Sequence, residues 1–491
     1  MNRISELTRR RRNSARLALY VSLLLVGLIG VGLFAWIQNL LAIRDFKAWS
    51  EADFEGHPAV VLLQEYIAID TSTPDGNAAA GAEFLAAELA EAGIPSTLER
   101  VGATDANLWA ILEGDDPRAV VFHHHIDVDP VSDLSVWKFP PFEGTLSGPW
   151  LYGRGAFDMK SVAVAQLEAF REVARRAAES GERPARTLIF LATSGEEIGS
   201  DLGMRWLLSQ RPELTERFAV VLTEGGAVEG RSEDDVKYWG TEFVQKRVVS
   251  VHLCSDRRQR LEDLRRELIA EGRPSTGLVI SPELEVFLEH YAETRDRDDW
   301  VQLLAAPRRL VHDVLAFEQL PGYLQSMFRN EAVPFPVEEV NGGFEMRVAL
   351  QLAPGADPQS AFEALLPPWR THGLGLWVEN DGAADAGSSA DHWILDDIER
   401  VIDRHYPGVP QGPLFLPWTM TDARFLRAKG IAAYGFSPFM VLTPEVLNLV
   451  ARGTVNERIA LPGYVEGVEI YRDLALHLAG FESASEAIDK K

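Results

Sequence analysis

The sequence has very little cysteine and comparatively little positive charge. Its single cysteine, Cys254, excludes an intrachain disulfide among 491 residues. The 48 Lys and Arg residues stand against 73 Asp and Glu residues, which gives a net charge of −25. Such an acidic chain is a poor nucleic-acid binder, so we expect no nucleic-acid partner. The same acidity is compatible with the recruitment of divalent cations.

Internal repeats and long low-complexity segments are also lacking, but one long apolar segment is present. Leu17–Ile37 is a stretch of 21 residues without a formal charge, long enough to cross about 30 Å of hydrocarbon as a helix. The preceding residues 1–16 are rich in arginine, which predicts a cytoplasmic N-terminus and an extracytoplasmic location for the rest. We therefore expect a single-pass membrane protein. A cleaved signal peptide is the alternative, but the apolar segment is long for one and no clear cleavage site follows it.

Beyond a linker over residues 38–56, helix-like and strand-like segments alternate, which predicts an α/β fold. We expect a mixed, mostly parallel central sheet with helices on both faces, formed by residues 57–240 and 385–480. An inserted α+β lid domain over residues 241–384 interrupts it, and residues 481–491 form a tail. The strands expected in the first part are 106–113, 118–124, 187–193 and 218–223, and the helices are 58–68, 78–92 and 159–179. Later come strands 343–352, 374–379 and 431–436, and helices near 393–405, 420–428 and 463–479.

Polar side chains gather at or near the ends of these strands. His125 and Asp127 follow one strand, Glu196 and Glu197 follow a second, and the sequence Thr223-Glu224-Gly225-Gly226 ends a third. Ligands in open α/β sheets bind outside the carboxyl ends of the strands. Two adjacent buried carboxylates are costly unless cations compensate them. Together with Asp158, these nitrogen and oxygen donors suit Zn²⁺ or a similar divalent ion.

Each cluster alone has a simpler interpretation. Neighbouring glutamates are common in solvated acidic turns, and a run of histidines is often a surface or hydrogen-bonded core feature. Asp158 stands just before an expected helix, where it could act as an N-cap without any metal. The combination in one order along the chain is what favours a metal site.

The chain resembles the zinc peptidase and aminoacylase family that includes carboxypeptidase S, glutamate carboxypeptidase and N-acyl amino acid hydrolases. The resemblance is carried by motifs in the family's order along residues 57–240 and 385–480. These motifs are His125–Pro130, Phe139–Gly144, Tyr152–Lys160, Gly195–Ser200, Glu224–Gly226, Thr421–Arg424 and Tyr434–Pro438. The resemblance implies a hydrolase that cleaves an amide bond next to a free carboxylate, in a small peptide or an N-acyl amino acid. It also implies a homodimer formed through the inserted domain.

The resemblance implies a role for each of these residues. His125, Asp158 and Glu224 would hold one metal, and Asp158 would bridge to a second metal bound by Glu197. Glu196 would be the general base that activates water and then protonates the leaving amine. Asp127 would orient His125, and Arg424 would help to position the substrate carboxylate or the lid. Zn²⁺ is expected, in one or two copies, with Co²⁺ or Mn²⁺ as alternatives.

The sequence departs from the family pattern at the second metal and in the lid. Gly453 stands where the family has a metal-binding histidine, and His123, His124 or His392 are candidates to replace it. The lid lacks the family's Gly-Gly-His-Ser-like segment, and His252 stands instead in an apolar alternation typical of a strand. The alternative function is therefore a catalytically impaired or inactive homologue that acts as a binding protein.

Overall fold

The computed structural model describes residues 49–131, 133–232, 235–271, 275–294, 299–379, 387–417, 419–442 and 455–481. Its centre is a ten-stranded mixed sheet in the order β1-β2-β6-β3-β7-β15-β9-β8-β16, with β14 paired to β9. Strands β6, β3, β7 and β15 run parallel to one another. The bounds are β1 Ser96–Arg100, β2 Ala106–Leu112, β3 Asp116–His125, β6 Arg186–Thr193, β7 Phe218–Thr223, β8 Ala227–Ser232, β9 Asp235–Gln245, β14 Gln411–Leu416, β15 Ala432–Gly435 and β16 Met440–Leu442.

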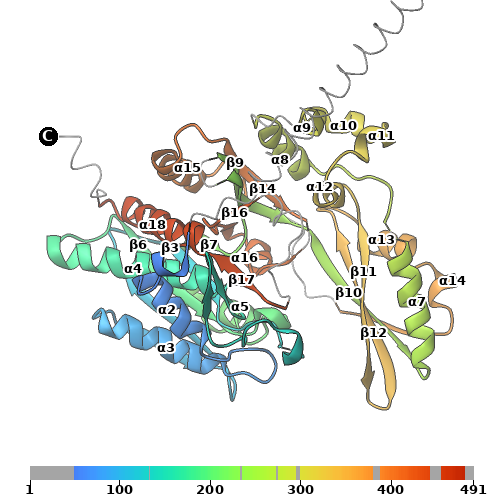
Figure 1. Cartoon of the computed structure of the whole chain (residues 1–491), viewed down its shortest axis with the longest axis horizontal. Helices are drawn as coiled ribbons and strands as arrows, with labels where there is room; N and C mark the ends of the chain where they lie inside the picture. The colour runs from blue at the N-terminus through green and yellow to red at the C-terminus, as the bar shows by residue number, and fades with distance from the viewer. Residues whose placement is uncertain are drawn as a thin grey trace, which may run out of the picture.

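Helices cover both faces of this sheet, as the sequence predicts. Alternate residues of β3 separate the two sides: Val120 and Phe122 join the larger core, whereas Val121 joins a second core on the opposite face. The larger core also receives α2 Pro58–Ile67, α3 Ala78–Glu91, α4 Lys160–Ser180, α15 Trp393–His405 and α18 Leu461–Leu478. Strands β3, β6 and β7 of this sheet lie beside helices α4 and α18 (Figure 1). The second core receives α5 Met204–Gln210, α6 Pro212–Thr215 and α16 Ala423–Ala428. The buried apolar strands and flanking helices confirm the predicted α/β class.

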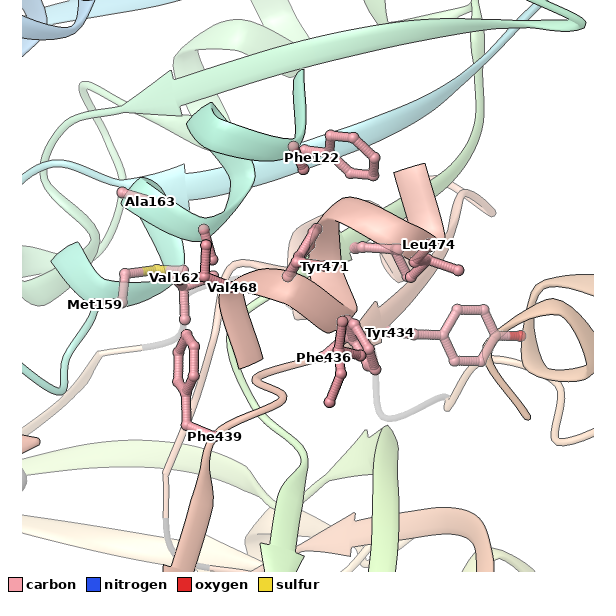
Figure 2. Packing of buried hydrophobic residues seen from close by; sticks show 14 of the residues in the cluster. Phe122, Met159, Val162, Ala163, Tyr434, Phe436, Phe439, Val468, Tyr471 and Leu474 are labelled. Carbon is pink, nitrogen blue, oxygen red and sulfur yellow. The ribbon is translucent and has the colours of Figure 1, made fainter. Parts of the chain in front are cut away.

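Helix α18 packs along α4 over the sheet (Figure 2). Tyr471 meets the ring of Phe122 edge to face, with ring centroids 5.4 Å apart. On the side towards β16, helix α18 closely approaches the backbone of Pro438 and the ring of Phe439 at Gly467. A Cβ atom at Gly467 would lie 2.2 Å from the carbonyl oxygen of Pro438 and 2.5 Å from the ring of Phe439. This glycine is therefore required by the close approach of the two segments.

Replacing Gly467 with Ala is expected to lower the free energy of unfolding by about 1–3 kcal/mol, because backbone atoms must shift to admit the methyl group. Alanine's better helix propensity, about 1 kcal/mol, opposes only part of that loss. Gly322→Ala is the matched control, since a Cβ there meets nothing within 4 Å. Chemical denaturation of both variants measures the difference. Equal stability of the two variants would contradict the close approach.

A second sheet forms the core of the lid, in the order β11-β12-β10-β13. Its strands are β10 Arg247–Ser255, β11 Glu331–Val340, β12 Gly343–Leu352 and β13 Gly375–Glu379, and its helices are α7 Arg258–Ala270, α13 Pro358–Leu365 and α14 Pro368–Thr371. Strands β10, β11 and β12 lie beside helix α7 (Figure 1). Asn341 and Gly342 join β11 to β12 with positive φ values of 52° and 79°, as a two-residue hairpin requires. His252 lies within β10, which confirms its interpretation as a strand residue.

The inserted segment also contributes to the larger core of the main sheet. Residues 282–327 form α8 Pro282–Ala292, α9 Asp299–Leu304, α10 Pro307–Leu310, α11 Val314–Phe317 and α12 Gly322–Met327. Their buried side chains, among them Phe287, Leu324 and Met327, join the same apolar cluster as α4 and α18. The lid sheet has a separate apolar cluster of its own. The segment predicted as one inserted domain thus divides its side chains between two cores.

The predicted anchor over residues 17–37 lies outside the described residues. Among the helices that are described, none combines the length and the hydropathy that a membrane span needs. A third, three-stranded sheet, β17-β5-β4, includes the strand that precedes the loop carrying Asp158. Its strands are β4 Thr145–Ser147, β5 Trp150–Tyr152 and β17 Arg458–Ala460.

Candidate active site

The predicted site residues come together where three neighbouring parallel strands end. Strand β3 ends at His125, and its neighbours β6 and β7 end at Thr193 and Thr223. The next residues along the chain carry the predicted carboxylates, so the topology alone brings them to one edge of the sheet. Asp158 reaches the same place from the loop that precedes α4.

His125 is the centre of the cluster. Its Nε2 atom lies 3.3 Å from Oδ1 of Asp158 and 3.9 Å from Oε1 of Glu224. The imidazole is 2% exposed, so these contacts are shielded from water. The alternative role of Asp158 as a helix N-cap is wrong: Met159 occupies the N-cap position of α4, and the carboxylate of Asp158 faces His125 instead.

Asp127 contacts the imidazole of His125 through its backbone rather than through its carboxylate. The Nδ1 atom of His125 lies 2.8 Å from the backbone carbonyl oxygen of Asp127, whereas the nearer carboxylate oxygen is 3.8 Å away. The carboxylate instead accepts hydrogen bonds from the backbone N–H groups of Glu196 and Glu197, at 3.1 and 3.0 Å. Asp127 therefore fixes the imidazole with its backbone and the Glu196-Glu197 turn with its side chain.

The two glutamates stand on a single 3₁₀ turn, Glu196–Ile198. Gly195 and Gly199 flank the turn with φ values of 76° and 100°, a left-handed backbone that favours glycine. The Arg424 guanidinium lies 3.3 Å from Oε1 of Glu196 and donates a hydrogen bond to the carbonyl of Thr421. Arg424 thus contacts the cluster through Glu196.

The electrostatics of the cluster reflect several acids in one buried place. Burial raises the pKa of Glu196, while His125 and Arg424 oppose the rise. Burial, followed by the charge of Asp158, raises the pKa of Glu197 well above its ordinary value. Burial alone would lower the pKa of His125, but Asp158 and Glu224 raise it well above the ordinary range. A group of carboxylates with elevated proton affinity is the environment that a bound cation would relieve.

Two sets of donors could hold a cation. One is His125, Glu196 and Glu224, and the other is His125, Asp158 and Glu197; the donor atoms of each set lie within 4.8 Å of one another. Oε1 of Glu197 is buried and has no hydrogen-bond partner among the described residues, and Nε2 of His125 faces two carboxylates without a well-aligned hydrogen bond. Buried polar atoms without partners are uncommon, and one imidazole with several carboxylates is a donor set suited to Zn²⁺. The residues therefore fit a divalent cation.

The three candidate replacements for the missing histidine are engaged elsewhere. His123 lies between the hydroxyls of Thr193 and Thr223, at 2.8 and 2.9 Å. His124 contacts Gln166, and His392 caps the first turn of α15. Neither donor set includes any of them. Gly453 itself lies outside the described residues.

The sequence interpretation assigned no role to Glu457. This buried carboxylate contacts the backbone of the loop that carries Asp158. In the sequence it stands in Asn456-Glu457-Arg458, a short polar element that follows soon after Gly453, and no local pattern there marks its role.

Fold and site together define an α/β enzyme domain with an inserted lid and a buried group of donors suited to a divalent cation. The model of Peptidase family M20/M25/M40 matches residues 121–477, which is more than half of the chain. The chain belongs to this family.

Two kinds of relatives agree with the family match. The chain is similar to aminoacylase-1 of Sus scrofa, with 26% identity over 456 residues, covering 86% of this chain and 96% of the relative. Its fold is similar to an M20 family metallo-carboxypeptidase from Sulfolobus solfataricus, with a TM-score of 0.62, 15% identity, and coverage of 86% of this chain and 100% of the other. The fold is also similar to human carnosine dipeptidase 1, with a TM-score of 0.60 and 15% identity, covering 87% of this chain and 98% of the other. The family match and the similarity to aminoacylase-1 support a hydrolase, and the two solved structures show the same fold.

Proposed function

We propose that this chain is a metal-dependent hydrolase that cleaves an amide bond adjacent to a free carboxylate, in an N-acyl amino acid or a short peptide. The observation that carries the proposal is the assembly of His125 with Asp158, Glu197 and Glu224 beside Glu196. The names of the relatives, an aminoacylase, a carboxypeptidase and a dipeptidase, support the substrate class.

His125, Asp158, Glu197 and Glu224 would hold the metal, and Zn²⁺ fits their donor atoms with Co²⁺ or Mn²⁺ as alternatives. A divalent cation bound there would acidify water and polarise the scissile carbonyl. Asp127 keeps the imidazole and the Glu196-Glu197 turn in place through the contacts described above. The first four residues would thus bind the metal, and Asp127 orients the side chains around it.

Glu196 is the proton carrier in this proposal. Its carboxylate is buried and shares a donor set with His125 and Glu224, and burial raises its pKa above the ordinary value for a glutamate, which suits a proton carrier. It takes a proton from the attacking water and delivers it to the leaving amine nitrogen. Arg424, at 3.3 Å, limits the rise in pKa and holds the carboxylate in one orientation. The products are a carboxylic acid and a free amine.

The substrate class is tested with a panel of N-acyl amino acids and dipeptides, incubated with the metal-replete full chain. Each compound is paired with a derivative whose α-carboxylate is amidated. We expect release of free amine from some members with a free carboxylate, and at least a tenfold lower kcat/KM for the amidated partners. Equal rates for both forms would contradict recognition of the carboxylate. Absence of turnover throughout the panel would contradict the function and favour a binding protein.

We also propose that residues 17–37 anchor the enzyme in a membrane with the catalytic domain on the extracytoplasmic side. The proposal is supported by the 21-residue uncharged stretch and by the arginines before it. Cell fractionation and protease digestion of intact and opened cells test it. We expect the chain in the membrane fraction and its catalytic domain accessible from outside the cytoplasm. Recovery in the soluble fraction at its full length would contradict an anchor.

A further inference from the structure

Glu457 is a buried acid that contacts the loop of the predicted metal ligand Asp158. The residue is fully buried. One carboxylate oxygen accepts hydrogen bonds from the backbone N–H groups of Phe157 and Asp158, at 2.9 and 3.0 Å. The other accepts from the N–H of Gly155 at 3.1 Å and from the Arg154 guanidinium at 2.8 Å. Four donors from four consecutive or nearly consecutive residues thus converge on one side chain.

The loop that Glu457 contacts has no helix or strand of its own. Residues 153–159 connect β5 to α4, and Gly155 has a φ of 83°. The backbone carbonyl of Glu457 also accepts a hydrogen bond from the N–H of Gly153, at 3.0 Å. Adjacent strand β17 then pairs with β5, with Arg458 opposite Tyr152. Glu457 therefore accepts hydrogen bonds from backbone N–H groups that would be paired within a helix or a sheet if the loop were regular.

Charge neutralisation alone does not require this arrangement. The ion pair with Arg154 would compensate a buried carboxylate by itself. The carboxylate of Glu457 also accepts a hydrogen bond from the backbone N–H of Asp158. The side-chain carboxylate of Asp158 in turn lies 3.3 Å from Nε2 of His125. Outer contacts of this kind orient metal ligands, and their loss commonly lowers metal affinity by about 10- to 100-fold.

We propose that Glu457 is a positioning residue that holds the backbone of Asp158 so that its carboxylate faces His125 and a shared divalent cation. The inference rests on the metal site of the proposed function. It assigns to the Asn456-Glu457-Arg458 element a role in metal binding although Glu457 itself binds no metal. Loosening this contact lowers metal affinity while the rest of the fold is retained.

The test is isothermal titration of Zn²⁺ into the metal-stripped full chain. Glu457→Gln keeps the size of the side chain but loses its charge and one acceptor, and we expect Zn²⁺ affinity to fall about 10- to 100-fold. Glu457→Asp keeps the charge and withdraws it by one methylene, and we expect a smaller loss. Glu229→Gln is the matched control, because Glu229 is a buried acid paired with Lys237 and Tyr291 and belongs to neither donor set. Its Zn²⁺ affinity should equal that of the unmodified chain.

Metal affinity distinguishes positioning from general stability, provided that circular dichroism shows each variant folded at the titration temperature. Unchanged affinity in folded Glu457→Gln overturns the inference, as does an equal loss in Glu229→Gln. Where Glu457→Gln does not fold, Glu457→Asp decides by the same criterion. A chain that binds Zn²⁺ but hydrolyses nothing leaves the positioning role standing and defeats the proposed function. A chain that binds no Zn²⁺ defeats both.

Discussion

Replacing Glu196 with Gln is expected to lower kcat for amide hydrolysis by about 10²- to 10⁴-fold, the range typical for removal of a general acid–base group. The amide keeps the shape of the side chain and its place beside Arg424, but it cannot take up the proton of the attacking water. Glu196 belongs to one donor set, but His125, Asp158 and Glu197 form the other set without it, so bound metal should be retained there. Steady-state kinetics together with elemental analysis measures both quantities.

Asp201→Asn is the control for this experiment. Asp201 lies five residues further along the same loop, but its side chain is 77% exposed and paired with Arg205. We expect its kcat to equal that of the unmodified chain. If Glu196→Gln retained full activity with its metal bound, Glu196 would not be the proton carrier.

Replacing His125 with Ala is expected to have the second large effect, because His125 belongs to both donor sets. Its loss leaves the four carboxylates of the two sets, three of them buried and that of Glu197 half-buried, without the only imidazole in either set. We expect Zn²⁺ affinity to fall by more than about 100-fold, beyond the loss seen for outer contacts. Hydrolysis at micromolar Zn²⁺ should fall by a similar or larger factor. Titration calorimetry measures the Zn²⁺ affinity, and kinetics at rising Zn²⁺ concentration measure the rate of hydrolysis.

His392→Ala is the matched histidine control. The sequence left His392 open as a replacement ligand, whereas its Nδ1 accepts from the N–H of Ile394 at the start of α15. Zn²⁺ binding and hydrolysis should therefore be unchanged, with at most a modest loss of stability from the cap. Loss of metal in His392→Ala, or its retention in His125→Ala, would place the site elsewhere.

The sequence predicted the parts of this molecule that depend on local patterns. The apolar run over 187–193 corresponds to β6, Arg186–Thr193, and the run over 218–223 corresponds to β7. Parallel strands end at one edge of a sheet, so finding these strands was enough to bring His125, Glu196 and Glu224 together. The periodic helices 78–92 and 393–405 were similarly found at Ala78–Glu91 and Trp393–His405.

Contacts between distant segments were beyond these patterns. The His-x-Asp spacing places Asp127 near His125, but it does not tell which oxygen accepts from the imidazole or that the carboxylate binds a turn 70 residues away. Glu457 contacts a loop about 300 residues earlier in the chain. Helices α8 and α12 lie in the segment predicted as the lid, and only the fold shows that their side chains Phe287 and Leu324 join the main core.

The most direct test of the account is the rate of amine release from an N-acyl amino acid before and after the metal is stripped from the purified full chain. We predict a loss of at least 100-fold on stripping and recovery on addition of Zn²⁺, Co²⁺ or Mn²⁺, with Glu196→Gln failing to recover. An undiminished rate in the stripped chain, or no turnover in the metal-replete chain, would contradict a metal-dependent hydrolase built around His125 and Glu196.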